Sequence, residues 1–197
     1  MPGKIVLFLS VSLDGYVEGD HHDLGWHRVG EELHRHFNEE LSAMGGFLSG
    51  RRTHQMMAEF WPTADTAPDS TPAMREFAGI WRDTPKTVYS TTLWRADWNT
   101  TVVPRVDTAE VRALAASATG DLALGGATLA AAFRELDLID VYQLYVHPAL
   151  VGRGTRLFPP TDTTADLRLD RTRTFPDGVV MLRYERVAAP AGAAPAR

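Results

Sequence analysis

The sequence predicts an α/β fold: a mixed, mostly parallel sheet with helices on both of its faces and an antiparallel hairpin at its end. Three observations lead to this prediction. Strand-like and helix-like segments alternate through most of the chain, which is typical of a parallel sheet covered by helices. The first apolar run, KIVLFLSV at residues 4–11, is continuous enough for a strand buried on both faces. Near the end, the turn triplet Pro176-Asp177-Gly178 separates two strand-like segments, 166–175 and 179–187, and so predicts a hairpin.

After the first strand, residues 12–28 are rich in Gly, Asp and His and predict a long loop. Loops of this length in compact domains are often functional. Residues 29–44 then predict an amphipathic helix, because apolar residues recur there at helical spacing while the other side is charged. The apolar residues of this helix are Leu33, Phe37, Leu41 and Met44.

The remaining elements before the hairpin follow from turn residues, capping residues and short apolar runs. Residues 61–72, which contain several Thr, Asp and Pro, are expected to lack a regular element. The predicted order is a strand at 46–49, a helix from about Thr53, a helix at 72–81, strands at 86–90 and 101–103, a helix from Asp107 or Thr108 to Gly120, a strand at 122–124, a helix at 127–136 and a strand at 141–146.

The length and composition predict one domain over residues 1–187. The chain has 197 residues, and its hydrophobic content of 44% is enough for a sizeable core. Residues 188–197, AAPAGAAPAR, contain no large apolar residue and predict a flexible tail.

Composition also excludes several classes of function. A net charge of -5 argues against nucleic acid as a partner. The absence of cysteine excludes disulfides, thiolate chemistry and cysteine-based zinc sites. The first apolar run is too short to span a membrane, so we expect a cytoplasmic protein without a membrane partner. No metal site is expected, because His34 and His36 lack the helical i, i+4 spacing.

Three strand ends carry residues suited to binding an anion. In open α/β sheets, ligands lie beyond the carboxyl ends of the strands, where helix N-termini offer unpaired N–H groups. Ser49-Gly50-Arg51-Arg52-Thr53 combines glycine with two guanidinium groups, Tyr89-Ser90-Thr91-Thr92 brings three hydroxyls, and Leu124-Gly125-Gly126-Ala127-Thr128 places two glycines before a helix. Each segment alone is more often a turn or a surface. Their joint occurrence favours an anion or nucleotide site.

The chain resembles the dihydrofolate reductase-like superfamily, and most closely the reductase domain of the bifunctional deaminase-reductase of riboflavin biosynthesis. The resemblance covers about residues 4–187 and lies in blocks that occur in the family's order. These blocks are SVSLDGYV (10–17), SGRRTHQ (49–55), KTVYSTT (86–92), LALGGATL (122–129) and VHPALVGRGTRLF (146–158). The resemblance implies NADPH as the cofactor, and the same mostly parallel sheet with a terminal hairpin.

The resemblance also implies roles for individual residues. Arg51, after Gly50, matches the family's arginine that contacts the adenosine 2'-phosphate, while Arg52 adds charge or points to solvent. Thr53 matches the threonine at the following helix start. The resemblance assigns Ser90, Thr91 and Thr92 to the adenosine half of the cofactor, and Gly125, Gly126 and Ala127, followed by Thr128, to its pyrophosphate. Two arginines at this place favour NADPH over NADH.

The substrate wall is less clearly marked. Asp14 is the candidate catalytic residue, able to orient a substrate amine or hydroxyl, but an Asp-Gly pair equally makes a tight turn. Asp23 and Trp26 resemble the substrate neighbourhood of folate reductases, although the longer separation from Trp26 to Gly50 argues against folate reduction. Trp26 and Trp61 either form a wall for a flat ring or fill the edge of the core.

Histidines in the same loop leave two readings open. His22 or His27 could contact the substrate or donate a proton, because imidazole titrates near neutral pH, or either could be solvated.

The function predicted is therefore NADPH-dependent reduction of a small heterocyclic substrate. The resemblance implies 5-amino-6-(5-phosphoribosylamino)uracil reduction in riboflavin biosynthesis. Two alternatives are a non-catalytic nucleotide or flavin (FMN) binding protein and a structural dimerisation module. A homodimer is expected in the first case too, because the terminal hairpin offers an exposed edge and related proteins are commonly dimers.

Overall fold

The structure is a computed structural model that describes residues 2–161 and 164–187. The tail expected at residues 188–197 lies outside the described residues. Eight strands form one sheet in the order β5 (Thr100–Val103), β4 (Lys86–Tyr89), β3 (Gly46–Gly50), β6 (Leu122–Gly125), β1 (Ile5–Ser12), β7 (Val141–His147), β10 (Val180–Arg186) and β9 (Leu167–Thr174). The first six strands of this order run parallel to one another, and β10 pairs antiparallel with both β7 and β9. This arrangement confirms the predicted fold class.

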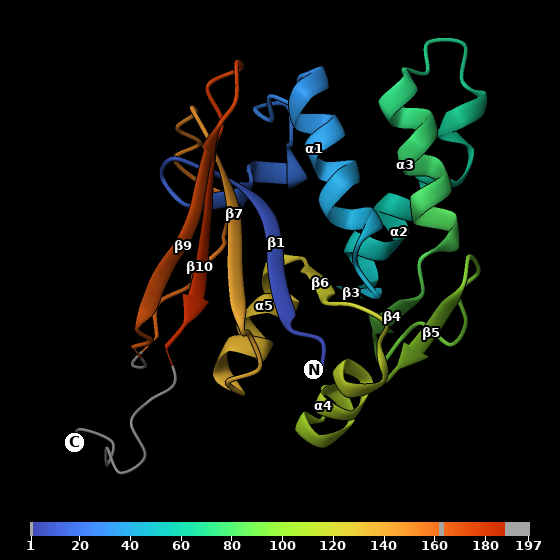
Figure 1. Cartoon of the computed structure of the whole chain (residues 1–197), viewed down its shortest axis with the longest axis vertical. Helices are drawn as coiled ribbons and strands as arrows, with labels where there is room; N and C mark the ends of the chain where they lie inside the picture. Colours follow the sequence, from blue (N-terminus) through green and yellow to red (C-terminus); the bar gives the residue numbers. More distant parts are fainter. Residues whose placement is uncertain (1, 162–163, 188–197) are drawn as a thin grey trace.

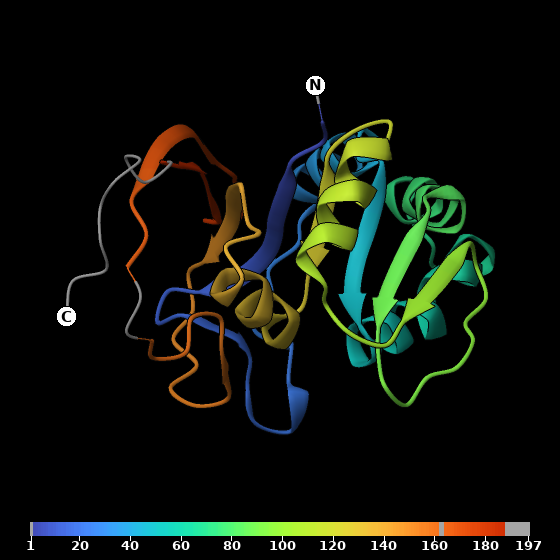
Figure 2. The same ribbon diagram turned by 90° about the horizontal axis from the view of Figure 1, so that it is seen from below.

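The two edges of the sheet are built differently. In the view from below, β5 lies at one edge and the β9–β10 hairpin at the other (Figure 2). All eight residues of β9 are exposed, and two of them, Arg171 and Arg173, form ion pairs with Glu40 and Glu32 of the neighbouring helix at residues 31–42. The hairpin turn lies at the predicted Pro176-Asp177-Gly178, where Gly178 adopts a φ of 84°.

Helices cover both faces of the sheet, as predicted. Their bounds are α1 (Glu31–Ser42), α2 (Arg51–Phe60), α3 (Pro72–Asp83), α4 (Thr108–Ser117) and α5 (Ala127–Glu135). Strand β1 shows the two layers, because its neighbouring residues point to opposite sides. Leu7 packs in a core with Val111 of α4 and Phe133 of α5. Phe8 packs instead against Phe37 of α1, with ring centroids 5.7 Å apart.

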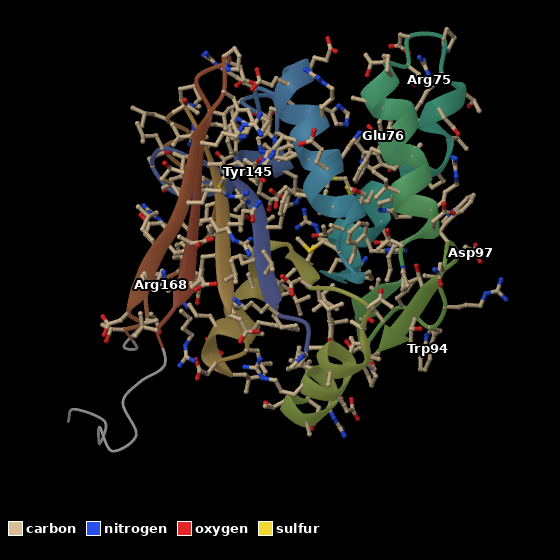
Figure 3. The ribbon with its side chains drawn as sticks, viewed as in Figure 1. Arg75, Glu76, Trp94, Asp97, Tyr145 and Arg168 are labelled. Carbon is tan, nitrogen blue, oxygen red and sulfur yellow. The ribbon has the colours of Figure 1, made fainter. Side chains whose placement is uncertain are left out.

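A second cluster of buried side chains lies under α1, where β7 meets β10. Its centre is Tyr145, which is fully buried and has its ring centroid 4.6 Å from that of Phe37. Figure 3 shows Tyr145 between the sheet and α1, and Figure 1 shows α1 beside α3. This cluster fixes α1 over the end of the sheet at which the candidate site lies.

Several elements differ from the prediction. Helix α2 begins at Arg51 rather than at about Thr53, so both arginines lie in its first turn. The segment after it was expected to be irregular, but residues Trp61–Thr66 form a 3₁₀ helix, η2. The predicted loop at 12–28 contains a short strand, β2 (Tyr16–Glu18), and a 3₁₀ helix, η1 (Asp20–His22). Strand β2 pairs with β8 (Thr155–Arg156), a contact between distant segments that local sequence does not encode.

Within the described ranges, no helix is both long and apolar enough to cross a membrane.

Candidate functional site

A pocket of about 850 Å³ opens at the carboxyl ends of β1, β3, β4 and β6. This volume lies toward the upper end of the range of small-molecule sites. Because the strands are parallel, their carboxyl ends meet at one edge, and the segments that follow them form the walls. Two sides can be distinguished by the elements that supply them.

The helix-start side of the pocket comes from the ends of β3 and β4 and the beginnings of α2 and α5. Its residues include Gly50, Arg51, Arg52, Thr53, Tyr89, Gly126, Ala127 and Thr128. The loop side comes mainly from β1, β2, the segment after β2, α1 and β8. Its residues are Phe8, Ser10, Val17, Glu18, His22, Leu24, His27, Phe37 and Thr155.

Two helix N-termini with glycine caps meet on the helix-start side. Gly50 precedes α2 and Gly126 precedes α5, and neither helix has a side-chain cap. The first N–H groups of both helices therefore lack the intrahelical and capping partners that such groups usually need, and the positive ends of both helix dipoles lie at the pocket. This is a binding arrangement for an anion such as a phosphate.

Gly126 is required by its local geometry. Its φ is 92°, in the region that favours glycine, and a Cβ atom there would lie 2.6 Å from Oγ1 of Thr53. The backbone of Gly126 thus passes directly beside the Thr53 hydroxyl. The structure brings together the second glycine of the Gly-Gly pair and the threonine of α2, two residues predicted from separate segments.

The two arginines have different surroundings. Nη1 of Arg51 donates a hydrogen bond to Oε1 of Gln55 at 2.9 Å, and no carboxylate of the described residues forms an ion pair with Arg51. Nη2 of Arg52 lies 3.7 Å from Oε2 of Glu18. Arg51 is therefore the guanidinium whose charge remains available to a ligand, whereas Arg52 is partly neutralised by the opposite wall.

Four of the predicted cofactor residues lie beside the pocket without lining it. These are Ser90, Thr91, Thr92 and Gly125, and the pocket wall at the end of β4 is Tyr89 instead. Oγ of Ser90 accepts hydrogen bonds from the backbone N–H groups of Thr92, at 3.1 Å, and Leu93, at 2.9 Å. This hydroxyl thus shapes the loop after β4. Contacts of the three hydroxyls with an adenosine remain a prediction.

Asp14 also lies outside the pocket. Its carboxylate accepts hydrogen bonds from Oγ of Ser12 at 2.6 Å and from the backbone N–H groups of Val151 and Gly152, at 3.0 and 2.7 Å. The hydrogen bond from Ser12, with those from Val151 and Gly152, outweighs desolvation and lowers the pKa of Asp14 to about 2. The side chain joins the turn after β1 to the loop after β7, which matches the turn interpretation and leaves its catalytic role an unsupported prediction.

The three predicted substrate residues have structural surroundings too, and none of them lines the pocket. Oδ1 of Asp23 accepts a hydrogen bond from the backbone N–H of Gly25 at 2.8 Å. Trp61 packs edge-on against Phe77, with ring centroids 4.5 Å apart, and so fills the edge of the core. Trp26 packs edge-on against His27, a residue of the pocket wall, with ring centroids 4.2 Å apart.

Among the described residues, Glu18 is the one acidic residue that lines the pocket, and sequence reasoning did not single it out. Its Oε1 accepts a hydrogen bond from Oγ1 of Thr155 at 2.6 Å and lies 3.0 Å from Nδ1 of His22. Burial opposes ionisation of this carboxyl, but the hydrogen bonds from Thr155 and His22 and the charge of Arg52 outweigh it and lower the pKa of Glu18. The pocket therefore contains a carboxylate ion whose side chain is only 20% exposed.

The pairing of β2 with β8 holds Glu18 in place. Glu18 lies opposite Thr155, and the approach of the two segments depends on Gly154, which has a φ of 134°. A Cβ atom on Gly154 would lie 2.1 Å from the carbonyl oxygen of Glu18. The only sequence signal for this arrangement is the Gly-x-Gly of residues 152–154, which reads as an ordinary turn.

The rest of the loop side is apolar or neutral. Phe8, Leu24 and Phe37 supply apolar surface, and His27 lies beside them. Burial lowers the pKa of His27, which favours the neutral ring at pH 7, and its ring stacks on that of His147 with centroids 5.1 Å apart. The structure thus places His22 and His27 on the wall of the pocket, and their contact with a substrate stays a prediction.

Comparison with known proteins gives a family for the chain. Residues 3–181 match the family model described as the RibD C-terminal domain. The protein YyaP of Bacillus subtilis (strain 168) is 29% identical over 182 residues, a region that covers 92% of this chain and 94% of YyaP.

Solved structures share the fold at low sequence identity. A protein of Shewanella sp. PV-4 assigned to riboflavin biosynthesis has a TM-score of 0.72 at 20% identity, with 95% of this chain and 99% of that chain covered. A diaminohydroxyphosphoribosylaminopyrimidine deaminase/5-amino-6-(5-phosphoribosylamino)uracil reductase of Thermotoga maritima has a TM-score of 0.64 at 13% identity, covering 94% of this chain but only 57% of that chain. Dihydrofolate reductase of Enterococcus faecalis, complexed with NADP(H), has a TM-score of 0.61 at 16% identity, with 94% and 98% covered. These structures confirm the predicted dihydrofolate reductase-like fold.

Proposed function

The chain belongs to the RibD C-terminal domain family, and on that premise we propose that it is an NADPH-dependent reductase of a small, flat heterocyclic substrate. One observation carries the proposal: the glycine-capped N-termini of α2 and α5 both face the pocket, next to the available guanidinium of Arg51. This combination fits the phosphates of a dinucleotide. The reductase names of the Thermotoga and Enterococcus proteins, and the NADP(H) bound to the latter, support the same proposal.

The residues present fit such a cofactor. The backbone N–H groups that follow Gly126 would receive the pyrophosphate, because the start of α5 has no side-chain cap and Gly126 keeps its backbone close to Thr53. Arg51 would bind a phosphate on the adenosine through two parallel hydrogen bonds, which fits a guanidinium that has no carboxylate partner in residues 2–161 and 164–187. NADPH supplies a hydride when bound. The protein's part is then to bind and orient the substrate and to exclude water from the reacting atoms.

The loop side supplies the place for the substrate. It adjoins the helix-start side across β1, and its surface is mostly apolar. Phe8 and Phe37 offer aromatic surface to a flat ring. Such a division of one pocket into a phosphate-binding side and an apolar side suits a bound dinucleotide next to a small heterocycle.

A calorimetric titration with NADPH, NADH and FMN tests the proposal. We expect NADPH to bind more tightly than NADH. Arg51→Ala should weaken NADPH binding by about tenfold to a hundredfold, because a charge-assisted hydrogen-bond pair to a phosphate contributes about 1.5–3 kcal/mol. NADH binding should change little, because it lacks the 2'-phosphate.

Arg35→Ala is the matched control, because Arg35 is an exposed arginine on α1 that contacts Glu31 at 3.9 Å and does not line the pocket. Failure of the unmodified protein to bind NADPH would refute the proposal. Binding of FMN in its place would assign the protein to the alternative class of flavin-binding proteins.

A homodimer remains part of the proposal. The exposed edge strand β9 is the surface that a second copy of the chain could extend by strand pairing.

A further inference from the structure

We propose that Glu18 determines the substrate class: the loop side takes an unphosphorylated heterocycle that donates N–H hydrogen bonds, and it rejects a substrate phosphate. This inference rests on the proposed reductase function and narrows it. It differs from the phosphoribosyl substrate named for the Thermotoga protein, which carries a phosphate on its sugar.

The loop side of the pocket contains a negative charge. Glu18 is an ionised carboxylate there, and no lysine or arginine of the described residues belongs to this side of the pocket. His22 has its Nδ1 directed at Glu18, and burial keeps His27 neutral. The net charge that a ligand meets on this side is therefore negative or zero.

A phosphate would be poorly held in such surroundings. Protein sites for phosphate dianions provide arginine, lysine or several backbone N–H groups, because the anion loses its hydration on entry. The two arginines and two helix N-termini of this pocket lie on the helix-start side, and Arg52 already faces Glu18. A second phosphate on the loop side would meet the Glu18 carboxylate, and like charges repel strongly where water is excluded.

The same carboxylate is suited to N–H donors. An ionised carboxylate only accepts hydrogen bonds, and its two oxygens together have about four lone-pair sites. Oε1 of Glu18 is used by Thr155 and His22, whereas Oε2 forms only an ion pair with Nη2 of Arg52 among the described residues, at 3.7 Å, which is longer than a hydrogen bond. Oε2 is thus free to accept from an amino group or a ring N–H of a ligand.

Glu18 is held rigidly enough to discriminate between ligands. Its backbone is fixed by the β2–β8 pairing and its carboxylate by the 2.6 Å hydrogen bond from Thr155. The apolar surfaces of Phe8 and Phe37 lie on the same side of the pocket. The loop side thus combines apolar surface for a flat ring with a fixed carboxylate acceptor.

The test compares 5-amino-6-(ribosylamino)uracil with its 5-phosphate, which differ only by the phosphate. Binding of each to the protein saturated with NADP⁺ is measured by ligand-observed NMR and calorimetry, for the unmodified chain and for Glu18→Gln. Saturation with NADP⁺ keeps the phosphate from binding at the helix-start side. Glu31→Gln is the matched control, because Glu31 is an exposed α1 residue with a 79% exposed side chain.

We expect the unphosphorylated compound to bind at least tenfold more tightly than the phosphate. Glu18→Gln should reduce this preference at least fivefold, whereas its NADP⁺ affinity should change by less than about twofold and its melting temperature should fall by only a few degrees, because the contacts with Thr155, His22 and Arg52 weaken. Equal or tighter binding of the phosphate would overturn the inference, and so would an unaltered preference in Glu18→Gln or the absence of binding by both compounds. Because the NADPH titration of the unmodified chain needs no substrate, it shows separately whether the reductase proposal has failed.

Discussion

The two sides of the pocket are encoded in the chain in different ways. The helix-start side is formed mainly by two short contiguous segments, residues 50–53 and 126–128, each at the junction of a strand with a helix. The loop side is formed by single residues from β1, β2, α1 and β8 and the segment after β2, and Thr155 lies 137 positions after its partner Glu18. The first side can bind through its backbone. The second depends on side chains that only the folded chain brings together.

This difference predicts that the two sides can be damaged independently. A change that alters the backbone at the helix starts should reduce cofactor binding and leave the loop side intact. A change that separates β2 from β8 should do the reverse. The following changes are ordered by the size of the effect on ligand affinity that we expect.

Gly126→Ala should have the largest effect, on NADPH affinity. The new Cβ would lie 2.6 Å from Oγ1 of Thr53, and alanine would be strained at a φ of 92°. Because the start of α5 would have to move, we expect NADPH affinity to fall by about a hundredfold, which corresponds to about 2.7 kcal/mol. Calorimetry measures this change.

Gly125→Ala is the matched control for this variant. A Cβ atom at Gly125 would make only ordinary contacts, at 3.9 Å from the carbonyl oxygen of Leu48 and from Cγ2 of Thr53. We expect its affinity for NADPH to stay within about threefold of the unmodified protein, less than 0.7 kcal/mol. Equal losses in the two glycine variants would show that the close contact with Thr53 is not the cause.

Gly154→Ala should damage the loop side in the same selective way. Its Cβ would lie 2.1 Å from the carbonyl oxygen of Glu18, so β8 could no longer pair closely with β2. We expect a loss of about 3 kcal/mol in the free energy of unfolding from overpacking and backbone strain. Affinity for the unphosphorylated probe should fall about tenfold, and affinity for NADPH should change little.

Gly152→Ala is the control that separates the effect of steric overlap with Glu18 from the effect of backbone strain. Gly152 also has a positive φ, 80°, but a Cβ there would meet no atom within 4 Å. The free energy of unfolding of Gly152→Ala should fall by only about 1 kcal/mol, and the variant should retain its affinity for the unphosphorylated probe. If both variants lose the probe equally, the pairing of β2 with β8 does not position Glu18.

The same division explains how far sequence reasoning reached. Alternating apolar runs and turn residues were enough for the sheet, the helices and the hairpin, because each signal is local. Arg51 and Gly126 were found for that reason, and the start of α2 was misplaced by only two residues. Glu18 was missed because its importance comes from Thr155 and Arg52, which no local pattern connects to it. Asp14, by contrast, stands in a visible Asp-Gly motif, and its carboxylate accepts hydrogen bonds from three donors within the protein.

Acid pH should loosen the loop side with a smaller effect than the glycine variants. His147 is fully buried at the end of β7, and its Nδ1 accepts a hydrogen bond from the backbone N–H of Arg28 at 3.0 Å. Its ring stacks on that of His27, which lines the pocket. Burial first, and then the nearby His27 and Arg28, lower the pKa of His147 to about 4, although Asp177 opposes the shift.

The sign of the effect follows from which state binds the proton. The unfolded chain protonates His147 near its ordinary pKa of about 6.5, whereas the folded protein resists protonation until about pH 4. The free energy of unfolding should therefore be unaffected by this group above pH 6.5 and should fall as the pH drops from 6.5 to 4, by at most about 1.4 kcal/mol per pH unit. Below pH 4 this contribution should level off.

Urea unfolding at pH 7, 6, 5 and 4 measures the decrease in the free energy of unfolding. His147→Asn, which retains a side-chain acceptor, should make this free energy depend less steeply on pH. His21→Asn is the control, because His21 is exposed. Protonation puts a hydrogen on Nδ1 of His147, so Nδ1 can no longer accept the hydrogen bond from the N–H of Arg28. The segment before α1 then loses this contact, whereas the N-termini of α2 and α5 do not depend on it. At pH 4, where about half of the folded molecules carry this proton, the affinity for the unphosphorylated probe should therefore fall about twofold more than the affinity for NADP⁺. Parallel losses of the two affinities would show that the sides of the pocket do not respond independently.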